Sequence, residues 1–127
     1  MEIEIKILDG FEVEANVNGQ KIKSDQSKES GGNGTAPNPF EYFLASTGLC
    51  VAHYVNAFCK QRDIDSKKIS IIESVSRDGS GKVKFSFSIK TPADFPEKYK
   101  EALIKAASGC AVKKAIQDGP VFEVKID

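Results

Sequence analysis

The chain has 127 residues, its 18 basic residues balance its 18 acidic ones, and apolar residues make up 40% of it. This length predicts a single domain over residues 1–127, with a core that needs neither disulfides nor a metal ion to hold it. The balanced charge argues against a nucleic acid or a membrane surface as a partner, because both require a basic face.

The N-terminus alternates charged residues with isoleucines, so no apolar segment of a signal peptide fits there. We therefore expect a cytoplasmic protein whose thiols stay reduced. The chain has three cysteines without CxxC spacing and one histidine. This set is typical of neither a structural zinc site nor a secreted disulfide scaffold, so no metal is expected.

Two segments near the N-terminus, 2–8 and 11–17, alternate apolar with polar or charged residues, the period of a half-buried strand. The turn dipeptides Asp9-Gly10 and Asn18-Gly19 follow them, and a short strand is expected over 21–24. Together these segments predict an antiparallel meander of three strands. The polar, Gly- and Ser-rich residues 25–37 predict a flexible connection, with a ligand lid as the alternative.

A helix is predicted from Pro39 to about Gln61. Asn38 is a favoured N-cap, Pro is tolerated at the first helical position, and Glu41 completes a capping box. The helix is apolar almost all round, so it must be buried. Its length of about 35 Å exceeds the radius of gyration of about 14 Å of a compact monomer of this size. One chain has too few other elements to cover such a helix, which predicts a homodimer.

The second half of the chain predicts a hairpin and two shorter helices. Residues 69–76 and 82–90 alternate again around a turn at 78–81. A second capping box, Asp94 to Glu97, predicts a helix to about Ala107. A short helix over 110–117 and a last strand over 121–126 complete the order βββ-α-ββ-αα-β, which is typical of an α+β fold.

The three cysteines differ in their predicted surroundings. Cys50 lies in the middle of the long helix, where a cysteine either packs as a small apolar residue or reacts. Cys110 begins a helix, where free N–H groups and the helix dipole favour a thiolate, although simple packing is the alternative. Cys59 lies nine residues after Cys50, about 180° around the helix, and we interpret it as structural.

His53 follows Cys50 by three residues, close enough on a helix to help ionise the thiol. A Cys–His hydrolase or transferase is therefore an alternative. Such an enzyme needs a third, orienting group and an oxyanion hole, and the sequence offers no candidate for either. We expect His53 to be partly buried or at the surface.

Two stretches of the sequence form recognisable motifs. The first follows Asp25-Gln26 and Gly31-Gly32 and reads Pro37-Asn38-Pro39-Phe40-Glu41-Tyr42-Phe43-Leu44-Ala45-Ser46-Thr47-Gly48-Leu49-Cys50. The second and shorter one is Gly109-Cys110-Ala111-Val112, before a short helix. Both resemble the OsmC/Ohr family, the osmotically induced and organic hydroperoxide resistance proteins. The order of elements agrees with this family over essentially the whole chain.

The resemblance implies an intertwined homodimer in which central long helices are wrapped by antiparallel sheets from both chains. It also implies a thiol peroxidase in which Cys50 attacks a small-molecule hydroperoxide and becomes a sulfenic acid. Cys110 then resolves this acid to a disulfide, which a dithiol reductant reopens. The implied chemistry requires no metal or organic cofactor.

The chain departs from the peroxidase members of this family at two positions. These members carry an arginine upstream of the first cysteine and a glutamate ten residues before it. Here no arginine precedes Arg62, and Phe40 lies ten residues before Cys50. The resemblance is thus to a divergent, OsmC-like branch.

Three residues are auxiliary candidates on this reading. Lys28 lies in the loop near the place of the missing arginine, and Glu41, which caps the helix, lies one residue beyond the place of the glutamate. The third candidate is His53. The alternative function is that of a non-peroxidase dimer that binds a small apolar or thiol-reactive ligand.

Overall fold

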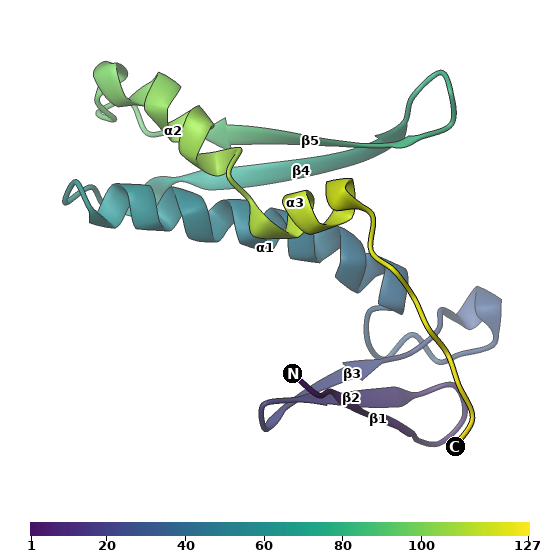
Figure 1. Cartoon of the computed structure of the whole chain (residues 1–127). Helices are drawn as coiled ribbons and strands as arrows, with labels where there is room; N and C mark the ends of the chain where they lie inside the picture. Colours follow the sequence, from purple (N-terminus) through teal and green to yellow (C-terminus); the bar gives the residue numbers. More distant parts are fainter. The chain divides into compact units, whose positions relative to one another are not determined.

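The computed structural model describes residues 1–127 and divides into two compact units, 1–44 and 45–127, with the boundary inside the long helix. The N-terminal unit contains an antiparallel sheet of β1 (Glu4–Ile7), β2 (Val13–Val17) and β3 (Gln20–Ser24), with β2 in the middle (Figure 1). The predicted meander is confirmed. The prediction that both units act as one domain stays a prediction.

The turn between β2 and β3 follows from its two residues. Asn18 and Gly19 have φ values of 52° and 84°, the left-handed conformation that a two-residue hairpin requires. Asn16 fixes this turn, because its Oδ1 accepts a 2.8 Å hydrogen bond from the N–H of Gly19. The dipeptide therefore sets the register, in which Ala15 pairs with Ile22.

The loop after β3 is organised around the carboxylate of Asp25, which is only 2% exposed. Its two oxygens accept hydrogen bonds from the N–H groups of Gln26 (2.7 Å), Asn33 (3.1 Å) and Thr35 (3.2 Å) and from the Thr35 hydroxyl (2.9 Å). The Thr35 N–H contributes most to lowering the pKa of Asp25, against the opposing effect of burial. The segment 25–37 thus has a defined hydrogen-bonded form, where the sequence predicted a flexible connection.

Helix α1 (Pro39–Lys60) begins as predicted and ends one residue earlier than predicted. Its N-terminus is a capping box. The N–H of Asn38 donates to Oε2 of Glu41, and the N–H of Glu41 donates to Oδ1 of Asn38, each over 2.9 Å. These bonds satisfy N–H groups that have no partner within the helix.

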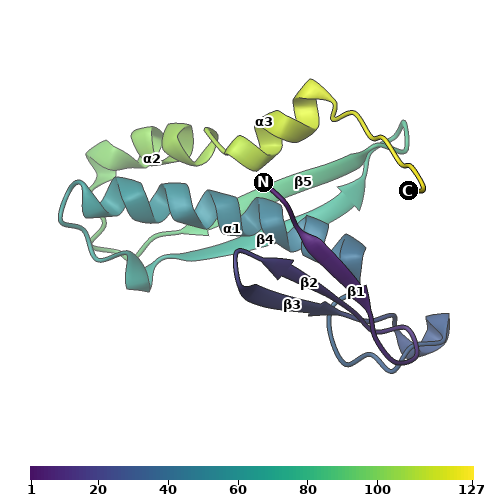
Figure 2. The same ribbon diagram turned by 60° about the horizontal axis from the view of Figure 1, so that its bottom comes forward.

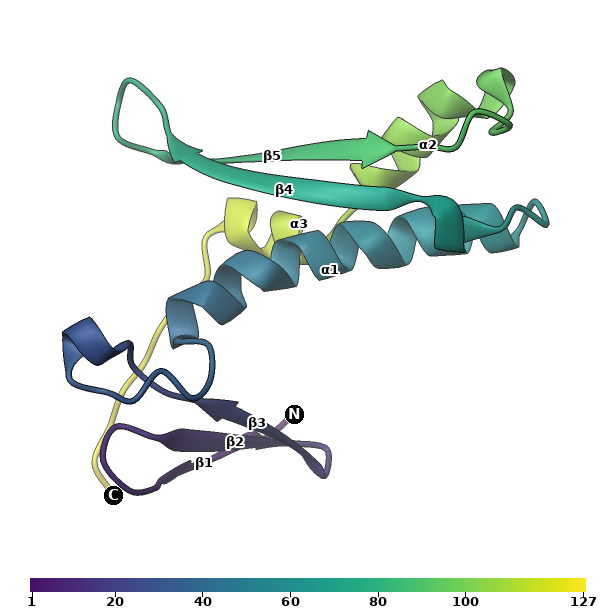
Figure 3. The same ribbon diagram turned by 180° about the vertical axis from the view of Figure 1, so that it is seen from behind.

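The C-terminal unit consists of elements that lie along α1. They are the hairpin of β4 (Ser70–Arg77) and β5 (Val83–Lys90), and the helices α2 (Lys100–Ala107) and α3 (Ala111–Asp118). Figure 2 shows α2 and α3 one after the other beside α1, and Figure 3 shows the hairpin alongside α1 from behind. Single-turn 3-10 helices precede β4 and α2, at Ser66–Lys68 and Glu97–Tyr99. The predicted α+β class is confirmed.

The core of this unit lies between α1, the hairpin and α2. Aromatic and aliphatic side chains of the hairpin, Ile71, Phe87 and Ile89, pack against it. Its buried members are Val51, Val55, Phe58, Cys59, Phe95, Leu103 and Ala107. Four of these seven come from one side of α1, so the helix is fixed to the rest of the unit along that side.

The predicted capping box at Asp94 is wrong. Helix α2 begins at Lys100, after the 3-10 turn, and Pro96 precedes that turn without a side-chain cap. Pro96 lies two residues after Asp94. It has no N–H group that could donate a hydrogen bond to the Asp94 carboxylate. Phe95, which is 5% exposed, fills the core from a turn in which its N–H donates to the carbonyl of Pro92 over 3.0 Å.

The predicted last strand is also wrong for this chain by itself. Residues 119–127 contain no strand, and all the apolar side chains among them are exposed, Val121, Phe122, Val124 and Ile126. Their alternation has the period of a strand, but a strand forms only where a neighbouring edge accepts its hydrogen bonds. In the structure, neither of the two sheets includes this segment.

Two further apolar faces that the sequence predicted to be buried are uncovered in a single chain. On β1, Ile5 is 61% exposed and Ile7 is 85% exposed. On α1, Leu49 is 64% exposed, and Ala45 and Ala57 are exposed on the same side of the helix. A single chain thus leaves part of α1 uncovered, as the sequence predicted for so long and apolar a helix.

Candidate active site

The site is built where the middle of α1 meets the N-terminus of α3. Cys110 is the N-cap residue of α3, with the non-helical φ of −53° and ψ of 120°. Its Sγ accepts a 3.3 Å hydrogen bond from the N–H of Lys113, the third residue of the helix. A cysteine thereby takes the place that Ser, Asp or Asn usually has at a helix start.

Cys50 reaches this helix start from α1. Its sulfur lies near the Cys110 side chain and the N–H groups of Ala111 and Val112, the first two residues of α3, and all three act on its ionisation. The structure thus brings together two cysteines that are sixty residues apart in the sequence. Both are free thiols.

These contacts act oppositely on the two thiols. Burial by itself raises the pKa of Cys50, but the hydrogen bonds with Cys110, Val112 and Ala111 outweigh it, and the pKa lies below the ordinary value of a thiol. For Cys110, burial and the hydrogen bond with Cys50 raise the pKa most, and the Cys50 charge adds to them. The N–H groups of Lys113 and Val112 offset this rise only in part. Cys50 is therefore the more acidic thiol of the pair, and Cys110 is the one that keeps its proton longer as the pH rises.

The first turn of α3 provides the positive potential at this site. Its N–H groups have no partner inside the helix, and the helix dipole places partial positive charge at the same end. An anionic sulfur at such an end is stabilised without a side-chain cation. The chain lacks an arginine before Arg62, and the N–H groups of Ala111 and Val112 act on Cys50 instead.

Cys59 is separate from this pair, as its helical position predicted. It is 0% exposed and belongs to the core. Burial raises the pKa of Cys59, and the charge of Arg62 opposes this effect only in part. The thiol of Cys59 is thus enclosed in the core and less acidic than an ordinary thiol.

The three auxiliary candidates lie elsewhere. His53 is exposed on α1, and the partners of the Cys50 sulfur are in α3 and its cap rather than at His53. Glu41 makes the capping box with Asn38 in the N-terminal unit. Lys28 is exposed in the same unit, at the start of the 3-10 helix Lys28–Ser30. Auxiliary roles for these residues stay predictions.

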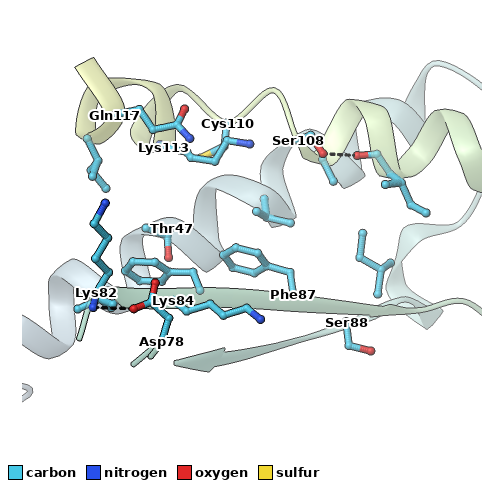
Figure 4. A pocket seen from close by; sticks show the side chains of 17 residues that line it. Thr47, Asp78, Lys82, Lys84, Phe87, Ser88, Ser108, Cys110, Lys113 and Gln117 are labelled. Carbon is cyan, nitrogen blue, oxygen red and sulfur yellow. Dashed lines mark hydrogen bonds between the residues drawn. The ribbon is translucent and has the colours of Figure 1, made fainter. Parts of the chain in front are cut away.

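A cavity of about 870 Å³ lies in the C-terminal unit between β5, α1 and the helices α2 and α3 (Figure 4). Its walls are mostly apolar, and Lys82, Lys84 and Lys113 are among its polar residues. Cys110 lines this cavity, and Cys50 does not. Figure 4 shows Cys110 on the helical side of the cavity, with Thr47 and Phe87 across from it.

Sequence reasoning missed two features of the site. One is the cavity, because the alternation of β5 reveals an inward face but not what lies opposite it. The other is the pair of N–H donors at Ala111 and Val112, which the position of Cys110 at a helix start could have indicated for any thiolate nearby. No three His, Cys, Asp or Glu side chains converge in a way that could hold a metal ion.

The fold and the site together define a small α+β protein in which two free cysteines of unequal acidity meet at a helix N-terminus. The family model described as OsmC-like protein matches residues 31–125, and the chain belongs to this family. None of the curated proteins matches it. None of its helices is long and apolar enough to cross a membrane.

Solved structures of similar fold come from several bacteria. A protein of Psychrobacter arcticus 273-4 described as osmotic stress induced and of the detoxification response has a TM-score of 0.72 and 15% identity, over 89% of this chain and 85% of its own. The organic hydroperoxide resistance protein OsmC of Legionella pneumophila has a TM-score of 0.54 and 21% identity, over 92% and 90%. The organic hydroperoxide resistance protein OhrB of Bacillus subtilis has a TM-score of 0.54 and 19% identity, over 94% of this chain and 93% of its own. At these identities, the likeness shows the fold.

Proposed function

We propose that this protein is a thiol-dependent peroxidase that reduces organic hydroperoxides, with Cys50 as the attacking cysteine and Cys110 as the resolving one. The observation that carries the proposal is the pair of cysteines at the start of α3, in which the pKa of Cys50 is lowered and that of Cys110 is raised. Organic hydroperoxide resistance proteins among the structures of the same fold support the choice of substrate.

In the first step, the Cys50 thiolate attacks the terminal oxygen of R–O–O–H. The O–O bond breaks, the electron pair leaves with RO⁻, and this alkoxide takes up a proton and departs as the alcohol. Cys50 is left as a sulfenic acid. Of the three thiols, only that of Cys50 has its pKa lowered, which is why the attack begins there.

In the second step, the sulfur of Cys110 attacks the sulfenic sulfur, the S–O bond breaks, and the hydroxide leaves as water with the proton of the Cys110 thiol. The negative charge of Cys50 is one of the causes that raise the pKa of Cys110 in the reduced pair. A sulfenic acid is neutral, so this cause disappears once Cys50 is oxidised. Cys110 then ionises more readily, and the two steps follow in a fixed order.

A dithiol closes the cycle by reducing the Cys50–Cys110 disulfide, which gives ROOH + R′(SH)₂ → ROH + H₂O + R′S₂ overall. We also infer that two copies form the working unit, as a homodimer. The uncovered apolar face of α1 at Ala45, Leu49 and Ala57 and that of β1 at Ile5 and Ile7 support this inference, because large exposed apolar patches are typical of interfaces.

The test is the fate of the three thiols under one equivalent of cumene hydroperoxide. Mass mapping should show a Cys50–Cys110 disulfide and a free Cys59. In Cys110→Ser, oxidation should stop at a sulfenic acid on Cys50 that dimedone captures, and Cys50→Ser should consume no peroxide. Cys59→Ala is the matched control and should turn over like the parent. Consumption by Cys50→Ser at the parent rate would overturn the proposal and leave the ligand-binding alternative.

A further inference from the structure

We propose that, in the disulfide form, a thiol reductant attacks the sulfur of Cys110, and that Cys50 leaves as a thiolate held by the first turn of α3. This inference rests on the proposed function, since it concerns the step that returns the oxidised pair to its working state. It assigns different roles to two sulfurs that a disulfide makes formally equivalent.

Cys50 is the better leaving group of the two sulfurs. In thiol–disulfide exchange, the sulfur that forms the more stable thiolate leaves faster. The N–H groups of Ala111 and Val112 at the start of α3 lie near the sulfur of Cys50 and favour its thiolate. Cys110 receives the N–H of Lys113 over 3.3 Å and shares that of Val112 with Cys50, and it lies beside the Cys50 charge in the reduced pair. Negative charge is therefore better accommodated on Cys50.

The reductant also needs a path to the sulfur that it attacks. A displacement at sulfur is in line, so the nucleophile approaches opposite to the bond that breaks. For attack on Cys110, the reductant has to come from the side away from Cys50. Cys110 contacts Cys50 and also lines the cavity of about 870 Å³, whereas Cys50 does not line it. The cavity in Figure 4 thus gives a reductant a route to Cys110 that Cys50 does not line.

Exposure by itself would favour the other sulfur. Cys50 is half-buried, and Cys110 is only 2% exposed. Exposure therefore predicts a mixed disulfide on Cys50, whereas the leaving group and the cavity predict it on Cys110. The position of the mixed disulfide distinguishes the two.

The proposed step is balanced as follows. The thiolate R–S⁻ forms a bond to the Sγ of Cys110, the Cys50–Cys110 bond breaks, and its electron pair goes to the Sγ of Cys50. The products are a Cys110–S–S–R mixed disulfide and the Cys50 thiolate. With a dithiol, the second thiol of the reductant then attacks the reductant's own sulfur and releases Cys110, which takes a proton.

The experiment uses a monothiol, so that the mixed disulfide accumulates. The disulfide is formed with diamide, which makes the test independent of peroxide. A brief pulse of 2-mercaptoethanol is followed by excess N-ethylmaleimide, and chymotryptic cleavage after Tyr54 or Phe58 separates Cys50 from Cys59. At the earliest times, we expect the mercaptoethanol adduct on Cys110 and the maleimide on Cys50. The reverse distribution would overturn the proposal.

A backbone substitution tests the role of the α3 turn. Ala111→Pro removes one N–H donor at the first helical position, where proline is tolerated. The preceding residue already has the extended ψ of 120° that proline favours, and the Ala111 side chain is exposed. We expect the ratio of Cys110 to Cys50 adducts to fall about threefold, because Cys50 becomes a poorer leaving group. An unchanged ratio would overturn the role of the turn.

Ala115→Gly is the matched control, because it weakens α3 without touching its first turn. It should leave the ratio as in the parent, and an equal fall in both variants would attribute the effect to helix stability instead. The two proposals fail separately. A protein that consumes no peroxide but gives the Cys110 adduct contradicts only the proposed function, and a peroxidase that gives the Cys50 adduct contradicts only the order of attack.

Discussion

Thr47 on α1 donates a 2.5 Å hydrogen bond to Oε1 of Glu73 on β4. The other carboxylate oxygen, Oε2, lies against Gly48, where an added Cβ would come within 2.6 Å of it. A glycine inside a helix costs about 1 kcal/mol relative to alanine. A side chain at position 48 would require this carboxylate, which joins α1 to the hairpin, to move.

The first prediction concerns this contact. Gly48→Ala should gain about 1 kcal/mol of helix propensity but displace Glu73 from Thr47, a hydrogen bond to a charged group that contributes about 1.5–3 kcal/mol. We expect a net loss of about 1 kcal/mol in the free energy of unfolding by urea titration. In a Glu73→Ala background, the same substitution should stabilise the protein. Equal effects in both backgrounds would show that the carboxylate does not constrain position 48.

The second prediction concerns the pH dependence of Cys50 reactivity. Alkylation requires the thiolate, so the rate rises with pH and levels off above the pKa. Because the pKa of Cys50 lies below that of an ordinary thiol, the midpoint for iodoacetamide should be lower than for a free cysteine. Cys110→Ala removes the donor from Cys110 and should move the midpoint to higher pH. Cys110→Ser keeps an O–H donor and a good N-cap, so its midpoint should lie nearer to the parent's.

The third prediction concerns the uncovered face of α1. Leu49 is 64% exposed in the single chain, and a homodimer would bury it. Leu49→Glu should weaken association, seen as monomer in sedimentation velocity at micromolar concentration, and Leu49→Ala should weaken it less. The unfolding midpoint of the parent should rise with protein concentration. A folded parent monomer with a concentration-independent midpoint would contradict the dimer.

The fourth prediction concerns Asp25. Its pKa is lowered in the folded chain, so its contribution to stability is fully present above the ordinary value of 3.8 and is lost as the pH falls through the lower folded value. Both carboxylate oxygens of Asp25 accept hydrogen bonds, and Asp25→Asn would leave only one oxygen that can do so. It should abolish hydrogen-exchange protection at the amides of Asn33 and Thr35. Glu29→Gln, at an exposed position of the same loop, should leave that protection unchanged.

Local sequence signals were sufficient for most of the fold. The capping box of Asn38 and Glu41, the turn at Asn18-Gly19 and the alternation of β4 and β5 depend on residues within a few positions of one another, and all three are confirmed. The failures came where a distant element decides. Asp94 has a capping pattern, but the burial of Phe95 in the core fixes a different entry into α2.

By itself, the sequence determined which cysteine stands alone and that Cys110 begins a helix. The helical period separates Cys59 from Cys50, and helix-start preferences depend on neighbouring residues alone. Only the tertiary structure decided that the first turn of α3 meets Cys50, because sixty residues of chain separate the two cysteines and only packing of α3 along α1 brings them into contact. The ionisation of Cys50 follows from that contact, since a thiol takes its pKa from the donors around it rather than from its place in the sequence.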